Sequence, residues 1–275
     1  MTSNNEIIFT LNNELKMPSI GLGVLFAKND GEVEAAVTAA LKAGYRKIDT
    51  AAAYQNEQGV GRAIKESGIP REDLFVTTKV WNSDQGYDKT LLAFEQSLEK
   101  LQTDYVDLYL IHWPVKSKYR DTYRAMEAIY ASGKARSIGV CNFNIQQLED
   151  LMEHSNIIPA VNQVEMHPHL SQNELLKFAD THKIQLEAWR PIMMGKVLHI
   201  SELGDIGKTY QKSAVQVALR WLIQRGVAVI PKSVTPKRIV QNFEIFDFEL
   251  TEEEMTMIEG LNQNRNLGED LSHVE

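Results

Sequence analysis

Cysteine is almost missing from this chain of 275 residues, in which Cys141 is the single example. One cysteine cannot form a disulfide within the chain, so we expect a reducing compartment such as the cytosol. No stretch approaches the ~20 consecutive apolar residues that a membrane-spanning helix requires. The opening residues, MTSNNEIIFTL, lack a basic segment followed by an apolar core, so we expect no secretory signal peptide.

An excess of positive charge is missing as well. The formal net charge is -8 at pH 7, and no long run of Lys or Arg offsets it. This argues against a nucleic-acid or anionic-membrane partner, although a local basic pocket for a phosphate stays open. The hydrophobic share of 43% and the charged share of 24% are ordinary for a globular protein with a sizeable core.

What the chain does have is a regular alternation of short apolar strands and amphipathic helices. The runs EIIFT and ELKMP flank the turn LNN and predict a hairpin ahead of the main fold. Eight strand–helix units follow without a linker, with strands expected at 19–24, 45–49, 74–80, 106–113, 135–143, 160–168, 184–189 and 227–233. A capping box from Thr251 to Glu254 predicts a last helix, followed by an irregular tail.

Short strands that are apolar on both faces are typical of a parallel sheet covered by helices on both sides. The closed form of such a sheet is a (β/α)8 TIM barrel, which would span residues 1–275 as one domain. The alternative is an open doubly wound sheet, whose dinucleotide-binding form requires G-x-G-x-x-G after the first strand. The run SIGLGV supplies Gly21 and Gly23 but neither the third glycine nor an immediate helix, which favours the barrel.

Four titratable residues stand at or just after the ends of predicted strands. Asp49 ends YRKID, Tyr54 lies in the loop behind it, Lys79 ends LFVTTK and His112 ends VDLYLIH. The carboxyl ends of barrel strands converge on the active site, so we expect these side chains to meet. Each taken singly fits a structural role as a cap, a solvated strand end or a core residue, but their shared position favours a functional one.

These four residue types together predict acid catalysis on a carbonyl group. A free tyrosine, with a pKa of about 10, is a poor acid at neutral pH. A lysine ammonium beside it stabilises the phenolate and lowers that pKa, and a carboxylate keeps the ammonium charged. Tyr54 is thus expected to protonate a carbonyl oxygen that a neutral His112 orients. No side chain delivers a hydride, so the hypothesis requires a nicotinamide cofactor.

The motifs DTAAAYQNE, TTKVW, LIHWP and IPKSVTPKRIVQN resemble those of the aldo-keto reductase family, in the family's order and over essentially the whole chain. The compact loop of HWPVKSKYRDTYRAMEAIY is similar to that of the short-loop bacterial glyoxal, methylglyoxal and 2,5-diketogluconate reductases. The resemblance implies a cytoplasmic, monomeric enzyme that reduces aldehydes and ketones with NADPH and has no obligate protein partner. Small α-dicarbonyls are the favoured substrates; the alternatives are diketo-sugar acids or a non-catalytic NADPH-binding sensor.

The resemblance also assigns binding positions. The nicotinamide positions are Asn142, Gln163 and Trp189. The positions for the adenosine 2′-phosphate are Lys232, Ser233 and Arg238, and those for the adenine are Gln241 and Asn242. An apolar substrate cleft would be lined by Leu25, Trp81 and Trp113, and it would be open because the tail lacks the long loop of larger relatives.

Two positions within the resemblance bear on a phosphate contact and on a metal site. Arg190 stands where the family usually has a serine that contacts the cofactor pyrophosphate. We expect its charge to replace that contact, or its side chain to turn to solvent or to a Glu or Asp on the nearby loop. The pair His167 and His169 belongs to a His-Pro-His run that fits the family pattern, so we assign no metal site there.

Overall fold

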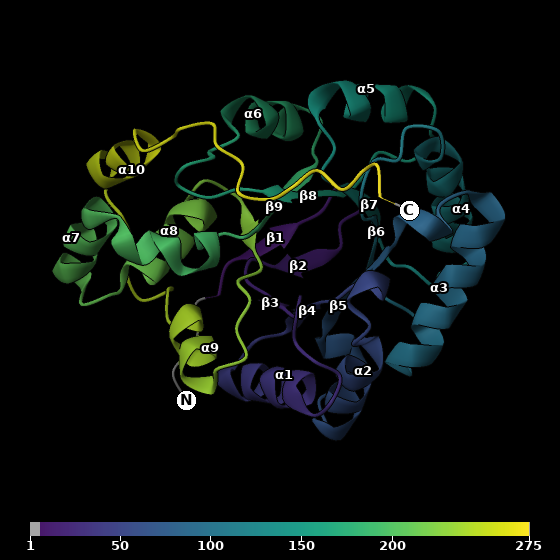
Figure 1. Cartoon of the computed structure of the whole chain (residues 1–275), viewed down its shortest axis with the longest axis horizontal. Helices are drawn as coiled ribbons and strands as arrows, with labels where there is room; N and C mark the ends of the chain where they lie inside the picture. Colours follow the sequence, from purple (N-terminus) through teal and green to yellow (C-terminus); the bar gives the residue numbers. More distant parts are fainter. Residues whose placement is uncertain (1–5, 275) are drawn as a thin grey trace.

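The computed structural model describes residues 6–274, and its centre is one sheet of eight parallel strands (Figure 1). In chain order the strands are β3 (Leu22–Gly23), β4 (Lys47–Asp49), β5 (Phe75–Val80), β6 (Leu108–Ile111), β7 (Ile138–Cys141), β8 (Val161–Glu165), β9 (Gln185–Trp189) and β10 (Ala228–Val229). Each strand pairs with the next one along the chain, as the regular alternation predicts.

The first and last strands of this sheet also meet, which closes it. Parallel bridges join Ile20 to Val229 and Gly23 to Lys232. The amide of Gly21 donates to the carbonyl of Val229 at 2.9 Å, and the amide of Val229 donates to the carbonyl of Ser19 at 2.8 Å. The predicted (β/α)8 barrel is therefore confirmed, and the open doubly wound alternative is wrong because this seam leaves no free edge between the first and last strands.

A ring of helices surrounds the strands (Figure 1). Its members are α1 (Glu32–Ala43), α2 (Glu57–Glu66), α3 (Tyr87–Leu101), α4 (Tyr119–Ala131), α5 (Ile145–Glu153), α6 (Asn173–Thr181), α8 (Ala214–Gln224) and α9 (Pro236–Phe243). Local sequence sets several boundaries: Asn144 and Gln147 form a capping box that begins α5, and Gly44 ends α1 with a φ of 113°.

The hairpin and the last helix lie where the sequence predicts them. Strands β1 (Ile8–Thr10) and β2 (Lys16–Pro18) pair antiparallel, and Met17 is fully buried against the apolar residues at the amino ends of the barrel strands. Helix α10 (Glu252–Glu259) begins at Thr251, whose hydroxyl accepts from the amide of Glu254. Among residues 6–274 no helix combines the length and the apolar character that spanning a bilayer requires.

The segment between β9 and α8 is largely helical. It contains a 3-10 segment, η4 (Met193–His199), and a further helix, α7 (Ser201–Tyr210). Leu203 and Ile206 of α7 are buried, and a Cβ on Gly207 would come within 2.4 Å of the Lys212 carbonyl oxygen. The two glycines in ELGDIGKTY weaken the helical pattern, but Gly207 is needed for the tight turn from α7 into α8.

The tail after residue 262 is irregular, as expected, but it is docked across the carboxyl end of the barrel. The amides of Leu267 and Gly268 donate to the carboxylate of Glu165 at 3.0 and 2.9 Å. The Asn82 side chain donates to the carbonyls of Leu271 and Val274 at 2.7 and 2.8 Å. In Figure 1 the tail, in yellow, runs past β9 and β8. The expectation of an open cleft is therefore wrong for this side of the barrel.

Candidate active site

The structure brings Asp49, Tyr54, Lys79 and His112 together at the carboxyl end of the barrel. Asp49 ends β4, Lys79 lies in β5, and His112 directly follows β6. Tyr54 ends η1 (Ala52–Tyr54), a single 3-10 turn in the loop after β4. The Nζ atom of Lys79 lies 2.6 Å from Oδ1 of Asp49 and donates to the Thr50 carbonyl at 3.0 Å. Both charged groups are almost fully buried.

Aromatic rings complete this cluster. The Nζ atom of Lys79 lies 5.1 Å from the ring centre of Tyr54. The Tyr54 ring meets the imidazole of His112 edge-on, with 5.6 Å between centroids. Trp81 meets His112 in the same way at 5.1 Å. The imidazole is therefore in contact with two aromatic rings, and its Nδ1 atom has no hydrogen-bond partner among residues 6–274.

Burial sets the proton-binding properties of the cluster. It raises the pKa of Tyr54 to about 12, while the Lys79 charge acts in the opposite direction. Lys79 thus lowers the pKa of Tyr54 as expected, but the larger effect of burial raises it. Burial also opposes the charge of Lys79, but the contact with Asp49 outweighs it and raises the pKa of the ammonium. Burial and then Lys79 lower the pKa of His112 well below 6.5, which keeps the imidazole neutral.

The residues expected to hold the nicotinamide lie on the other wall of the barrel. Asn142 follows β7 in a left-handed backbone conformation, with a φ of 64°, which asparagine tolerates better than most residues. Its Nδ2 donates to the His112 carbonyl at 3.0 Å, and its Oδ1 accepts from the indole of Trp189 at 2.8 Å. Asn142 thus joins the catalytic cluster to the aromatic ring that is expected to stack on the cofactor.

Gln163 lies between these two walls. Its Nε2 donates to Oδ2 of Asp49 at 2.8 Å and to Oε2 of Glu187 at 2.7 Å. Its Oε1 has only a long contact of 3.9 Å from the Cys141 thiol. A buried amide oxygen without a strong donor suits a ligand group that offers it a hydrogen bond.

The residues expected to bind the adenosine end gather around α9. Lys232 and Arg238 are exposed, and neither has an ion-pair partner among the described residues. The Ser233 hydroxyl accepts from the Thr235 amide at 3.1 Å, just before the first turn of α9. Gln241 is exposed on that helix and Asn242 is buried. Two cations at a helix N-terminus suit a phosphate.

Arg190 lies near an acidic side chain and an aromatic ring. Its Nη1 lies 3.9 Å from Oε1 of Glu165, and its guanidinium lies 5.3 Å from the ring centre of Trp189. A Cβ on Gly268 would lie 3.1 Å from the same Nη1 atom. The arginine therefore stands beneath the docked tail, beside the expected nicotinamide site.

Of the three residues expected to line the substrate cleft, one contacts the catalytic cluster and two lie in neighbouring loops. Trp81 is half-buried against His112, as described above. Leu25 and Trp113 are half-buried in the loops that follow β3 and β6. The carbonyl of Trp113 accepts from the Gln85 side chain at 2.7 Å, which ties the Trp113 loop to the loop after β5.

Several residues at this site were not predicted. Lys47 and Glu187 form a buried ion pair of 2.6 Å inside the barrel, and Glu165 and Asn82 hold the tail. The signal for the pair was present, because a lysine and a glutamate interrupt the apolar strands YRKID and IQLEAW. The tail contacts carried no such signal, since Asn82 lies 189 residues before its partner Leu271.

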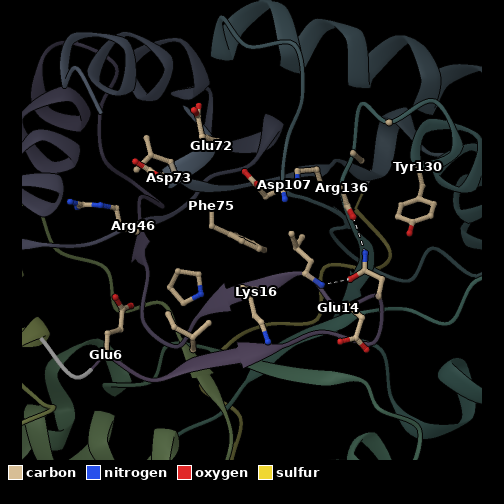
Figure 2. Close-up of a pocket in the computed structure, with 17 residues that line it drawn as sticks. Glu6, Glu14, Lys16, Arg46, Glu72, Asp73, Phe75, Asp107, Tyr130 and Arg136 are labelled. Atoms are coloured by element: carbon tan, nitrogen blue, oxygen red, sulfur yellow. Dashed lines mark hydrogen bonds and ion pairs between the residues drawn. The ribbon is translucent and has the colours of Figure 1, made fainter. Parts of the chain in front are cut away.

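A cavity of about 900 Å³ opens at the opposite end of the barrel, between the β1–β2 hairpin and the amino ends of the strands (Figure 2). Eight of the 17 residues that line it are charged: Glu6, Glu14, Lys16, Arg46, Glu72, Asp73, Asp107 and Arg136. Asp107 is fully engaged, with Arg71 at 2.8 Å and Arg136 at 3.0 Å. None of the four clustered residues borders this cavity, and the amino end of a barrel generally serves stability.

The fold and the site define a (β/α)8 barrel with an acid–base cluster at its carboxyl end. Residues 19–263 match the model of the Aldo/keto reductase family, and the chain belongs to this family. It is 54% identical over 258 residues to glyoxal reductase of Bacillus subtilis (strain 168), covering 94% of each chain. It is 45% identical to the methylglyoxal reductase DkgA of Salmonella typhimurium, covering 97% of each chain. A Bombyx mori aldo-keto reductase solved in complex with NADP superposes with a TM-score of 0.90, at 38% identity over 97% of this chain and 96% of that one.

Proposed function

We propose that this protein reduces small aldehydes and ketones to alcohols with NADPH, and that α-dicarbonyls such as glyoxal and methylglyoxal are its favoured substrates. The observation that carries this proposal is the series of contacts from the buried Asp49 through the buried Lys79 to the half-buried Tyr54, beside a neutral His112. The names of the Bacillus and Salmonella relatives support the substrate class.

The proposed chemistry divides between the cofactor and the chain. NADPH, when bound, supplies a hydride to the carbonyl carbon. His112 donates a hydrogen bond to the carbonyl oxygen and fixes its direction. Tyr54 gives its phenol proton to the same oxygen, which completes the alcohol. Lys79 stabilises the phenolate left behind, and Asp49 holds the ammonium in place.

The cofactor would occupy the positions that the family resemblance assigns. Asn142, Gln163 and Trp189 would hold the nicotinamide; Arg190 the pyrophosphate; Lys232, Ser233 and Arg238 the 2′-phosphate; and Gln241 and Asn242 the adenine. The apolar groups of Leu25, Trp81 and Trp113 would line the substrate cleft. The unpaired cations beside α9 support NADPH over NADH, because they suit the additional phosphate.

We further propose that residues 1–275 act as one domain, as a cytoplasmic monomer without an obligate protein or nucleic-acid partner. The single cysteine and the net charge of -8 support this proposal.

A Tyr54→Phe variant tests the assignment of the acid. It should bind NADPH within about twofold of the parent, and its kcat/KM for methylglyoxal should fall at least about a hundredfold, the usual contribution of a general acid. Loss of NADPH absorbance measures turnover, and cofactor fluorescence measures binding.

The matched control is Tyr210→Phe, which removes a hydroxyl bonded to Glu254 at 2.6 Å and far from the site; it should keep parental turnover. Parental turnover in Tyr54→Phe would refute the acid assignment. Binding of NADPH without oxidation across an aldehyde panel would instead favour the sensor.

A further inference from the structure

A second ion pair lies inside the barrel, below the catalytic one. Lys47 and Glu187 are fully buried, and Nζ of Lys47 lies 2.6 Å from Oε1 of Glu187. Lys47 precedes Asp49 by two residues in β4, so both side chains point into the barrel. The pair carries no part of the proton transfer proposed above, yet a hydrogen bond connects it to that machinery.

The connection is the side-chain amide of Gln163. Its Nε2 donates to Glu187 on one side and to Asp49 on the other. Two carboxylates offer only acceptors, and an amide has donors on its nitrogen alone. The orientation of Gln163 is therefore dictated by its neighbours: both amide hydrogens face carboxylates, and Oε1 must face away from them.

The fold makes room for this arrangement at some cost. A Cβ on Gly21 would lie 2.6 Å from Cε of Lys47, so the lysine fits only because β3 begins beside a glycine. Buried ion pairs seldom add stability over apolar residues of the same size, because both charges lose their hydration. A gain in stability therefore does not explain why this pair is present, whereas a role in orienting Gln163 does.

We propose that Lys47 and Glu187 are positioning residues that lock the Gln163 amide. Locked in this way, Oε1 of Gln163 accepts a hydrogen bond from the carboxamide NH2 of the nicotinamide, and Nε2 holds the free oxygen of Asp49. Cofactor recognition and the Asp49–Lys79 pair are thus set by one amide. This inference rests on the proposed function in so far as NADPH binds at this end of the barrel.

The test compares NADPH with its 3-acetylpyridine analogue, in which a methyl group replaces the carboxamide NH2. Fluorescence titration gives the ratio of the two Kd values without any need for turnover. The parent should bind the analogue roughly tenfold more weakly, the usual effect of losing one buried hydrogen bond. Glu187→Gln should reduce this ratio about threefold or more, because Gln163 then loses one of the two carboxylates that fix it. Lys47→Met should act in the same direction.

A double-variant cycle with Gln163→Leu identifies the route of the effect. In that background Glu187→Gln should leave the ratio unchanged, since the amide through which it acts is gone. Asp107→Asn is the matched control: it also removes a buried paired carboxylate, but at the other end of the barrel. It should lower the Tm and keep the parental ratio.

Four results are decisive. An unchanged ratio in Glu187→Gln, or equal effects of that change with and without Gln163, would overturn the inference. Normal cofactor discrimination without methylglyoxal reduction would refute the proposed function and leave the inference standing. A parent that binds no NADPH would overturn both.

Discussion

The imidazole of His112 is a clear case in which burial decides the charge of a single residue. Its pKa in the folded chain lies well below 6.5 because of burial and the neighbouring Lys79 charge, whereas the unfolded chain has the ordinary value of about 6.5. Below that pH the imidazole of His112 binds a proton in the unfolded state but stays neutral in the folded state. The stabilising contribution is therefore complete above pH 6.5 and is lost as the pH falls.

We expect this loss to appear in urea unfolding. Between pH 7.5 and 5.5 the free energy of unfolding of the parent should fall by up to about 1.4 kcal/mol more than that of His112→Gln, which cannot titrate. Measurements at pH 7.5, 6.5 and 5.5 compare the two proteins. Identical pH slopes would show that His112 keeps its ordinary pKa in the folded chain.

Arg190 tests whether a charge can replace the hydroxyl that the family usually has. If it assists pyrophosphate binding, Arg190→Ser should raise the Kd of NADPH about tenfold at low salt and flatten its salt dependence. Cofactor fluorescence at 20 and 300 mM salt measures both effects. Lys196→Ser, which removes an exposed cation from the same segment after β9, is the control. If affinity is unchanged at both salt concentrations, the guanidinium serves Glu165 and the tail instead.

At the scale of elements, the docked tail is the feature that most changes the shape of the site. Gly268 lies so close to Trp189 that a Cβ would come 2.5 Å from Cη2 of the indole. Gly268→Ala should therefore lift the tail from the aromatic ring. We expect faster hydrogen exchange over residues 266–274 and a change of at least about threefold in the KM for methylglyoxal, because one wall of the cleft moves.

The neighbouring exposed residue provides the control. Glu269→Ala should leave both exchange and KM at parental values. Asn82→Ala tests the same docking from the other end, since it removes both side-chain hydrogen bonds to Leu271 and Val274. Parental exchange in Gly268→Ala and Asn82→Ala would mean that neither contact holds the tail.

The elements that sequence predicts well are those fixed by local physics. The strands follow from apolar runs bounded by turn residues, and the end of α1 follows from Gly44. The meeting of Asp49 with Lys79 follows from topology, because adjacent parallel strands end at one edge. The charged residues Lys47 and Glu187 are visible in their strands, but their pairing across 140 residues is not encoded by local patterns. The same holds for the tail, whose contact with Asn82 spans 189 residues.

At the scale of the whole molecule, closure of the barrel turns a row of strand ends into one site. Asp49 on β4 and Gln163 on β8 lie 114 residues apart and touch across the interior. That contact exists only because the seam between β3 and β10 bends the sheet into a ring. The sequence pattern predicts the closed form, but the seam itself depends on how closely two backbones approach.

Gly23 makes that approach tight, since a Cβ there would lie 2.9 Å from the Ile230 carbonyl oxygen. Backbone cannot move aside as a flexible side chain can, so Gly23→Ala should cost about 1–3 kcal/mol of stability. Gly204→Ala is the matched substitution, because a Cβ at that position in α7 meets nothing within 4 Å. It should be neutral or stabilise by up to about 1 kcal/mol, as alanine favours a helix. Urea unfolding of both variants measures the difference; equal stabilities would mean that the seam is loose enough to accept a side chain, and that closure depends on the strands' other contacts.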